Sequence, residues 1–189
     1  MWMDEEEMSE TMYWKCIEND QKKYWSLITD SNWSYMYCRD IQDRPEVRKH
    51  ITKPKFAYLY CRYIKDRPEI RKYITEPEWV YLYCGFVVDR PEIRKYITDA
   101  ENSYYYCKYV KDIPEIRKYI IESEWAYLYC RDIEDKPEVR KNITDSHWSY
   151  YYCKDVEDRP EVSKNITNSR WVFNYCENIK DRPEVKKYI

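Results

Sequence analysis

Glycine is almost absent from this chain of 189 residues, and Gly85 is the only copy. Without glycine, the helices cannot end in the common left-handed cap, and no glycine-rich loop exists to hold a nucleotide phosphate. Long apolar runs are also missing, because no stretch approaches the ~20 residues that cross a bilayer. The first residues lack the basic start and apolar middle of a signal peptide. We therefore expect no contact with a membrane.

Histidine is scarce as well, with two copies, His50 and His147, in different positions of the pattern described below. No local arrangement of serine, histidine and acid recurs, and no H-E-x-x-H motif is present. Acidic pairs such as Asp89 and Glu92 recur throughout the chain, which is typical of helix caps and not of a catalytic pair. We expect no enzymatic activity, no cofactor and no metal site.

The abundant feature is a repeat of 23 residues that is marked by cysteine. Cys16 falls one residue short of the period and belongs to a degraded first copy. The regular positions are Cys38, Cys61, Cys84, Cys107, Cys130, Cys153 and Cys176. A module this short cannot bury an apolar face alone, so its copies must stack on one another.

One copy, residues 75–97, contains two helix starts. Thr75-Glu76-Pro77-Glu78 resembles a capping box with Thr75 as the cap, and Asp89-Arg90-Pro91-Glu92 places Asp89 in the same role. Proline is tolerated in a first turn because its missing N–H has no partner there. The pattern predicts a helix A at about 76–88 and a shorter helix B at about 90–97.

Helical spacing predicts which side chains of this copy are buried. At about 100° per residue, one broad face of helix A carries five side chains. They are Trp79, Val80, Tyr83, Cys84 and Val87. Helix B offers only Ile93 and Ile97, and it is too short to be stable without packing.

These signals predict an all-α, right-handed α-solenoid of about eight repeats. Residues 1–28 form a degraded N-terminal capping repeat, and residues 29–189 form seven regular repeats in one continuous array. The pattern is least regular at 100–121, where Asn102 replaces an aromatic residue, Ile113 a basic one and Ile121 the capping threonine. We expect a packing fault at Asn102 and a bend or a specialised contact in this region.

The cysteines are not expected to pair. Stacked helices lie about 8–10 Å apart, whereas a disulfide needs Cα atoms within about 7 Å. We interpret cysteine as a small apolar side chain that allows close packing of helices. Unpaired thiols in this number favour a reducing, intracellular and cytoplasmic setting.

Two surface stripes are candidates for binding. On helix A, a tyrosine lies four residues before a cation, and such a row could hold an acidic peptide or stack on bases, or it could merely flank the core. The pairs are Tyr35 with Arg39, Tyr58 with Arg62, Tyr104 with Lys108, Tyr127 with Arg131 and Tyr150 with Lys154. Gly85 interrupts this row beside Tyr81.

The second stripe consists of basic residues on helix B, which could contact phosphates in register. It runs through Arg48-Lys49, Arg71-Lys72, Arg94-Lys95, Arg117-Lys118, Arg140-Lys141, Lys164 and Lys186-Lys187. The alternative is a local role, because Lys49 follows Glu46 by three residues and cations suit the end of a helix. Charged residues make up 36% of the chain but the net charge is only −2, which favours a protein partner over nucleic acid.

The segment Glu76-Pro77-Glu78, together with Tyr81 to Cys84, resembles the short two-helix repeats of bacteriophage and large DNA virus proteins, with cysteine in place of the usual alanine. More distantly the chain is similar to tetratricopeptide and Sel1-like arrays, whose units are longer. The resemblance implies an α-solenoid and a viral origin, with action inside a host cell, and it transfers no active site.

We therefore expect a non-catalytic scaffold that binds another protein, such as a host or defence factor, with nucleic-acid binding through the tyrosine, arginine and lysine rows as the alternative. The chain ends at Ile189 without a polar cap, which suggests association between copies through that end.

Overall fold

The computed structural model describes residues 3–188. Over that range the chain forms sixteen helices and no strand. Contacts between Cα atoms divide it into two compact units, Met1–Tyr96 and Ile97–Ile189. The all-α fold class predicted from the sequence is confirmed.

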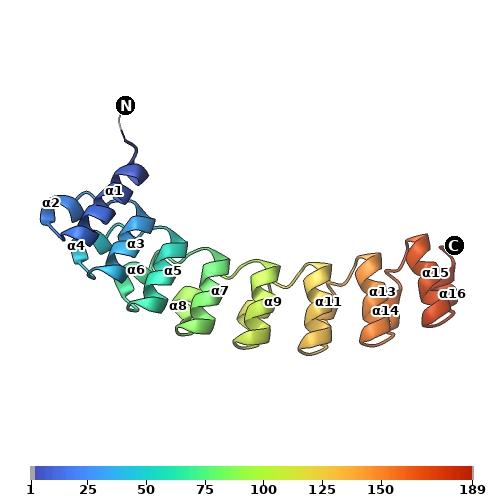
Figure 1. Cartoon of the computed structure of the whole chain (residues 1–189). Helices are drawn as coiled ribbons and strands as arrows, with labels where there is room; N and C mark the ends of the chain where they lie inside the picture. Colours follow the sequence, from blue (N-terminus) through green and yellow to red (C-terminus); the bar gives the residue numbers. More distant parts are fainter. Residues whose placement is uncertain (1–2, 189) are drawn as a thin grey trace. The chain divides into compact units, whose positions relative to one another are not determined.

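The first unit holds eight helices within its described part, residues 3–96 (Figure 1). They are α1 (Glu5–Glu18), α2 (Lys22–Trp25), α3 (Ser31–Asp40), α4 (Pro45–Arg48), α5 (Pro54–Tyr63), α6 (Pro68–Arg71), α7 (Pro77–Phe86) and α8 (Pro91–Arg94).

The second unit holds the other eight within residues 97–188. They are α9 (Ala100–Tyr109), α10 (Pro114–Arg117), α11 (Ser123–Asp132), α12 (Pro137–Arg140), α13 (Ser146–Asp155), α14 (Pro160–Ser163), α15 (Ser169–Asn178) and α16 (Pro183–Lys186).

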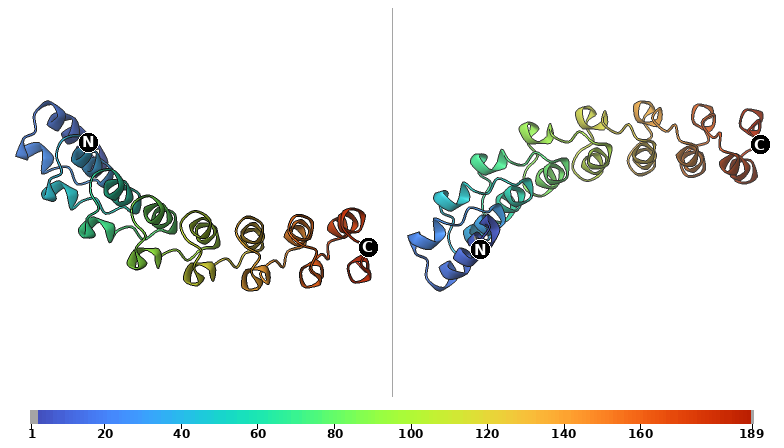
Figure 2. Two further views of the ribbon diagram at one scale, coloured as in Figure 1. Left: turned by 90° about the horizontal axis from the view of Figure 1, so that it is seen from below. Right: turned by 90° about the horizontal axis from the view of Figure 1, so that it is seen from above.

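Each regular repeat joins a helix of 10 residues to a single-turn helix of 4 residues. Within each unit, the long helices form one row and the short helices a second row beside it (Figure 2). Long helices of successive repeats pack together, as α3 does on α5 and α11 on α13. This confirms an α-solenoid built from 23-residue repeats, while its hand stays a prediction.

The helices are shorter than the sequence pattern predicts. The helix predicted at 76–88 is α7, Pro77–Phe86, and the helix predicted at 90–97 is the single turn α8, Pro91–Arg94. Beyond α8 the backbone tightens, and the Tyr96 N–H donates to the Ile93 carbonyl at 3.1 Å. Three-residue bonds of this kind are common where a helix ends, and they turn the chain toward the next long helix.

The predicted threonine cap is wrong by one residue. The N-cap of α7 is Glu76, not Thr75, and its side chain makes no capping bond. Where the same position holds aspartate or asparagine, the cap is formed: the Asp145 carboxylate accepts the N–H groups of His147 at 2.9 Å and Trp148 at 3.3 Å. The short side chain reaches back to the first turn, which is why these residue types dominate caps.

The predicted cap of helix B is also wrong. The N-cap of α8 is Arg90, whose side chain makes no capping bond, and the Asp89 carboxylate instead accepts a hydrogen bond from Arg94 at 2.6 Å. Proline follows the cap directly and fixes the backbone of the first turn, so the helix starts without a side-chain acceptor.

The core matches the predicted face closely. Val80, Tyr83, Cys84, Ile93 and Ile97 are buried, whereas Trp79 and Val87 are half-buried. All eight cysteines are free, and all are buried except Cys176, which is half-buried. Burial raises the pKa of the Cys84 thiol to about 12, so it stays protonated and acts as a small apolar group.

The side chain of Asn102, where a packing fault was predicted, forms a hydrogen bond. Its side-chain amide donates to the Asp99 carboxylate at 3.0 Å, and its backbone N–H donates to the same oxygen at 2.9 Å. The residue that replaces an aromatic ring therefore reinforces the N-cap of α9.

Candidate binding surfaces

Within each unit, a network of side chains joins one repeat to the next. In the first unit, Asp43 follows α3 and accepts hydrogen bonds from Arg48 at 2.6 Å, from the Tyr60 hydroxyl at 2.9 Å and from Arg67 at 3.0 Å. Burial raises the pKa of Asp43, but the bonds from Arg48 and Tyr60 outweigh it, and the pKa lies below its usual value. The carboxylate is therefore charged and acts as a structural clamp.

The same contact recurs between a tyrosine hydroxyl and the aspartate 17 residues before it. The pairs are Tyr37–Asp20, Tyr60–Asp43 and Tyr83–Asp66 in the first unit, and Tyr129–Asp112, Tyr152–Asp135 and Tyr175–Asp158 in the second. Each of these tyrosines is 0% exposed. This network was not predicted from the sequence, although an aspartate and a tyrosine that return in every copy were its signal.

The predicted stripe on helix A is present as pairs but not as a row of open rings. In all five pairs the cation lies 5.2 to 6.0 Å from the ring centroid. The five rings are only 2 to 6% exposed, so no base can stack on their faces. They pack on an aromatic ring of the next repeat, as Tyr58 does on Trp79 at 5.7 Å. A binding role for this stripe stays a prediction. Four of its cations are exposed, namely Arg39, Arg62, Arg131 and Lys154, whereas Lys108 is half-buried.

Most short helices end in one basic residue and are followed by a second, and the two have different surroundings; α14 carries Ser163 in place of the first. Arg117 binds Asp112 at 2.7 Å and Glu138 of the next repeat at 2.9 Å, and Arg48 is 7% exposed. The lysines that follow are exposed, and within residues 3–188 none of them makes an ion pair. We call Lys49, Lys72, Lys95, Lys118, Lys141, Lys164 and Lys187 the lysine ladder. The expected pairing of Lys49 with Glu46 is not formed.

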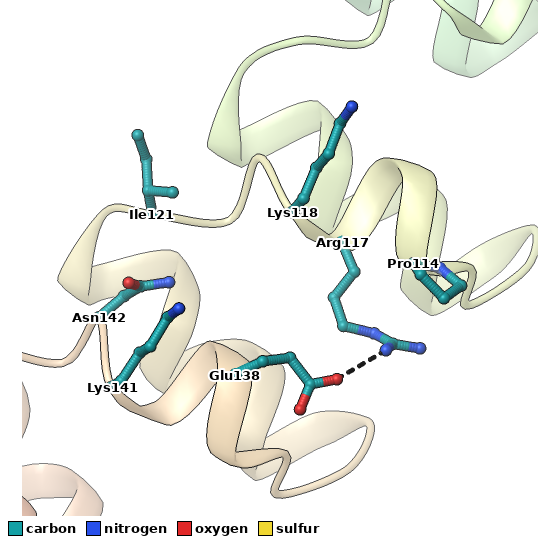
Figure 3. A pocket seen from close by; sticks show the side chains of 7 residues that line it. All are labelled: Pro114, Arg117, Lys118, Ile121, Glu138, Lys141 and Asn142. Atoms are coloured by element: carbon teal, nitrogen blue, oxygen red, sulfur yellow. Dashed lines mark hydrogen bonds and ion pairs between the residues drawn. The ribbon is translucent and has the colours of Figure 1, made fainter.

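Shallow pockets separate successive short helices. The largest described has a volume of about 360 Å³, lies between α10 and α12 and is shown in Figure 3. It is lined by Pro114, Arg117, Lys118, Ile121, Glu138, Lys141 and Asn142. Equivalent pockets of about 250, 310 and 210 Å³ separate α4 from α6, α6 from α8 and α12 from α14. Each pocket contains two ladder lysines.

The α10–α12 pocket combines apolar and polar walls. The bond from Arg117 to Glu138 bridges the two short helices on one side, and Ile121 and Asn142 lie on the other (Figure 3). Asn142 is held in place because its amide donates to the Ile120 carbonyl at 2.8 Å. Ile121 is 66% exposed and belongs to the irregular segment 100–121. At this pocket the irregular repeat therefore presents an apolar side chain where other copies carry threonine.

The predicted contact between copies through the C-terminal end depends on Ile189, which lies outside the described residues. None of the helices within residues 3–188 has the length and the apolar composition of a membrane span. No three histidine, cysteine, aspartate or glutamate side chains of residues 3–188 gather as metal ligands would.

The chain matches no family model, no curated protein and no solved structure. The resemblance to viral repeat arrays therefore stays a prediction.

Proposed function

We propose that this chain is a non-catalytic repeat scaffold that binds an acidic segment of another protein along the ladder lysines of one unit. The observation that carries the proposal is a difference between recurring groups. In most repeats the aspartate, the tyrosine and the arginine are used in contacts between repeats, as at Asp43, Tyr60 and Arg67. The ladder lysine is the recurring charge that the described residues leave without an ion pair.

A ladder suits an extended ligand. One exposed lysine contributes little by itself, since surface ion pairs are worth about 0–1 kcal/mol. Lysines in register within one unit add their effects, because the first contact raises the local concentration of the rest of the ligand. The second unit presents Lys118, Lys141, Lys164 and Lys187 in this way.

The pockets favour a polypeptide over a nucleic acid. Each holds a glutamate, such as Glu138, whose carboxylate pairs with Arg117 at 2.9 Å and so adds little repulsion toward an acidic peptide. The same pocket offers Pro114 and Ile121 as apolar contacts, which a peptide side chain can use. The resemblance to viral repeats directs the search for the partner to host proteins.

The test uses a fluorescein-labelled peptide of twelve glutamates and the full chain, with binding measured by anisotropy. The ladder variant carries Lys→Gln at Lys118, Lys141, Lys164 and Lys187. The control variant carries the same four changes at exposed lysines outside the ladder, Lys23, Lys65, Lys111 and Lys180. We expect at least a tenfold loss of affinity in the ladder variant and less than a threefold loss in the control.

A single-stranded DNA of twenty nucleotides, titrated across salt concentrations, separates the alternative. DNA binding whose log affinity falls steeply with log salt, without peptide binding, would establish nucleic-acid binding instead. Equal losses of peptide affinity in both variants would show that net charge alone is sensed, and the ladder would have no special role.

A further inference from the structure

One position of the repeat divides the copies into two groups. The residue two places after the repeat cysteine is polar in four copies and aromatic in three. The polar group is Asp40, Asp132, Asp155 and Asn178, and the aromatic group is Tyr63, Phe86 and Tyr109. The aromatic residues are 58%, 58% and 62% exposed. They therefore add little to the apolar core, and burial does not make up for the loss of the carboxylate.

The carboxylate at this position links two repeats. Asp132 accepts hydrogen bonds from the Tyr104 hydroxyl at 2.5 Å and from Lys108 at 2.8 Å, both in the preceding repeat, and it pairs with Arg131 at 2.6 Å. The Arg131 bond is the main reason why the pKa of Asp132 lies well below its usual value. Asp155 accepts from the Tyr127 hydroxyl at 2.7 Å in the same manner. Hydrogen bonds to charged groups are stronger than those between neutral groups.

The copies at α5 and α7 forgo these bonds. Arg62 donates to the Tyr58 hydroxyl, but within residues 3–188 it makes no ion pair. Its guanidinium carbon lies 5.1 Å from the Tyr63 ring centroid and 4.4 Å from the Phe86 ring centroid. Arg62 is thus attracted to two exposed rings but has no carboxylate partner among the described residues, so this position offers both a charge and apolar surface to a ligand.

We propose that Arg62, Tyr63 and Phe86, which we call the Arg62 patch, bind a partner protein that presents a carboxylate flanked by apolar side chains. The partner's carboxylate takes the place that Asp132 fills for Lys108, and its apolar side chains cover the two rings. Arginine and tyrosine are enriched among the residues that dominate binding energy at protein interfaces. The proposal rests on the proposed function only in requiring a protein partner, and it uses a different surface from the lysine ladder.

Two neighbouring features agree with an acidic ligand that approaches closely. The helix α5 carries Lys55 and Arg62 and no acidic residue, so its charge complements a carboxylate. Gly85, the only glycine, stands where five other copies carry a long cation. Glycine has no side chain, so no second cation from this position covers the Phe86 ring.

The experiment is a selection of phage-displayed random twelve-residue peptides on the full chain, followed by affinity measurements on synthesised peptides. We expect enriched peptides to contain aspartate or glutamate next to large apolar residues. Their affinity should fall at least tenfold in Tyr63→Asp/Phe86→Asp and in Arg62→Gln. It should change less than threefold in the four-lysine ladder variant and in Tyr109→Asp, which makes the same change in the other unit.

The double variant is a safe test of binding because it restores an arrangement that the chain already uses at Asp132. We expect it to melt at least as high as the parent chain by circular dichroism. Failure to enrich any peptide, or peptides that bind the double variant unchanged, would overturn the patch. Peptides that lose affinity only in the ladder variant would overturn the patch and leave the proposed function standing. A dimer of the parent chain that the double variant dissociates in light scattering would identify a second copy as the occupant instead.

Discussion

The tyrosine before each repeat cysteine has two structural roles, one for its ring and one for its hydroxyl. Its ring is fully buried, and its hydroxyl reaches a charged aspartate of the previous repeat, as Tyr60 does with Asp43. The Tyr60 oxygen also accepts a hydrogen bond from Arg67 at 2.9 Å. One side chain thus supplies apolar burial and the link between charges, and we expect substitutions here to be costly.

The first prediction separates these two contributions. Tyr60→Phe keeps the ring but removes the hydroxyl, and we expect a loss of about 1–2 kcal/mol in the free energy of unfolding, measured by urea denaturation. The control is Tyr63→Phe, which removes a hydroxyl from a ring that is 58% exposed and should change stability by less than about 0.5 kcal/mol. Equal effects of the two substitutions would contradict the role of the network.

The second prediction concerns alkaline pH. Burial raises the pKa of Cys107, Cys130 and Cys153 to about 12 from the ordinary value of 9.0. Unfolded thiols therefore lose protons near pH 9 while folded thiols keep them, so this stability is full below pH 9 and is lost as pH rises toward 12. We expect the urea midpoint to fall between pH 8.5 and 10.5. Replacing the three cysteines with alanine should flatten that fall, and an unchanged slope would assign it to other groups.

The sequence predicted the buried residue types well and their partners poorly. Spacing within one helix was enough to place Tyr83 and Cys84 on the core face and Tyr127 beside Arg131. Bonds such as Tyr60 to Asp43 or Tyr127 to Asp155 span 17 and 28 residues and depend on how one repeat stacks on another. Periodicity alone does not contain that register, so the tyrosines of the helix A stripe could not be recognised as buried.

At the scale of the helix, the starts differ between copies even though the repeat is regular. Asp145 caps α13 with its side chain, whereas Glu122 at the N-cap of α11 makes no such bond. The sequence placed the cap one residue too early, because threonine followed three residues later by glutamate is the usual signature. Proline at the first helical position of α7 makes Glu76 the cap.

The third prediction follows from this correction. Asp145→Ala should lower the free energy of unfolding by about 1 kcal/mol, the usual cost of losing an N-cap. Glu122→Ala and Thr75→Ala should each change it by less than about 0.5 kcal/mol, since neither residue caps a helix through its side chain. Urea denaturation measures all three, and a larger loss in Thr75→Ala would restore the capping box.

At the scale of the whole molecule, each unit is a stack in which a repeat contacts its immediate neighbours. Long helices pack on the long helices before and after them, as α11 does on α9 and α13. Stability in such a stack is close to a sum of repeat and interface contributions, so the number of repeats can change without loss of the fold.

The fourth prediction tests this additivity. Deleting residues 124–146 removes one complete 23-residue period and joins equivalent positions, so we expect a folded chain that melts cooperatively at a somewhat lower temperature. Deleting residues 124–135 removes half a period and brings unlike surfaces together. Circular dichroism should show that the helical content of this second variant falls by more than the twelve deleted residues account for. Equal ellipticity per residue in both deletion variants would contradict the additive stacking of repeats.

Because one thiol lies in the core of each repeat, thiol reactivity can report how often each repeat separates from its neighbours. Seven of the eight cysteines are covered while their helices stay packed, and Cys176 is half-covered. An alkylating reagent can therefore reach each sulfur only as fast as that repeat separates from its neighbours. Mass spectrometry of timed samples would measure the alkylation rate of each cysteine and so rank the repeats by their rate of local unfolding, without any engineered label. Cys176 should react first.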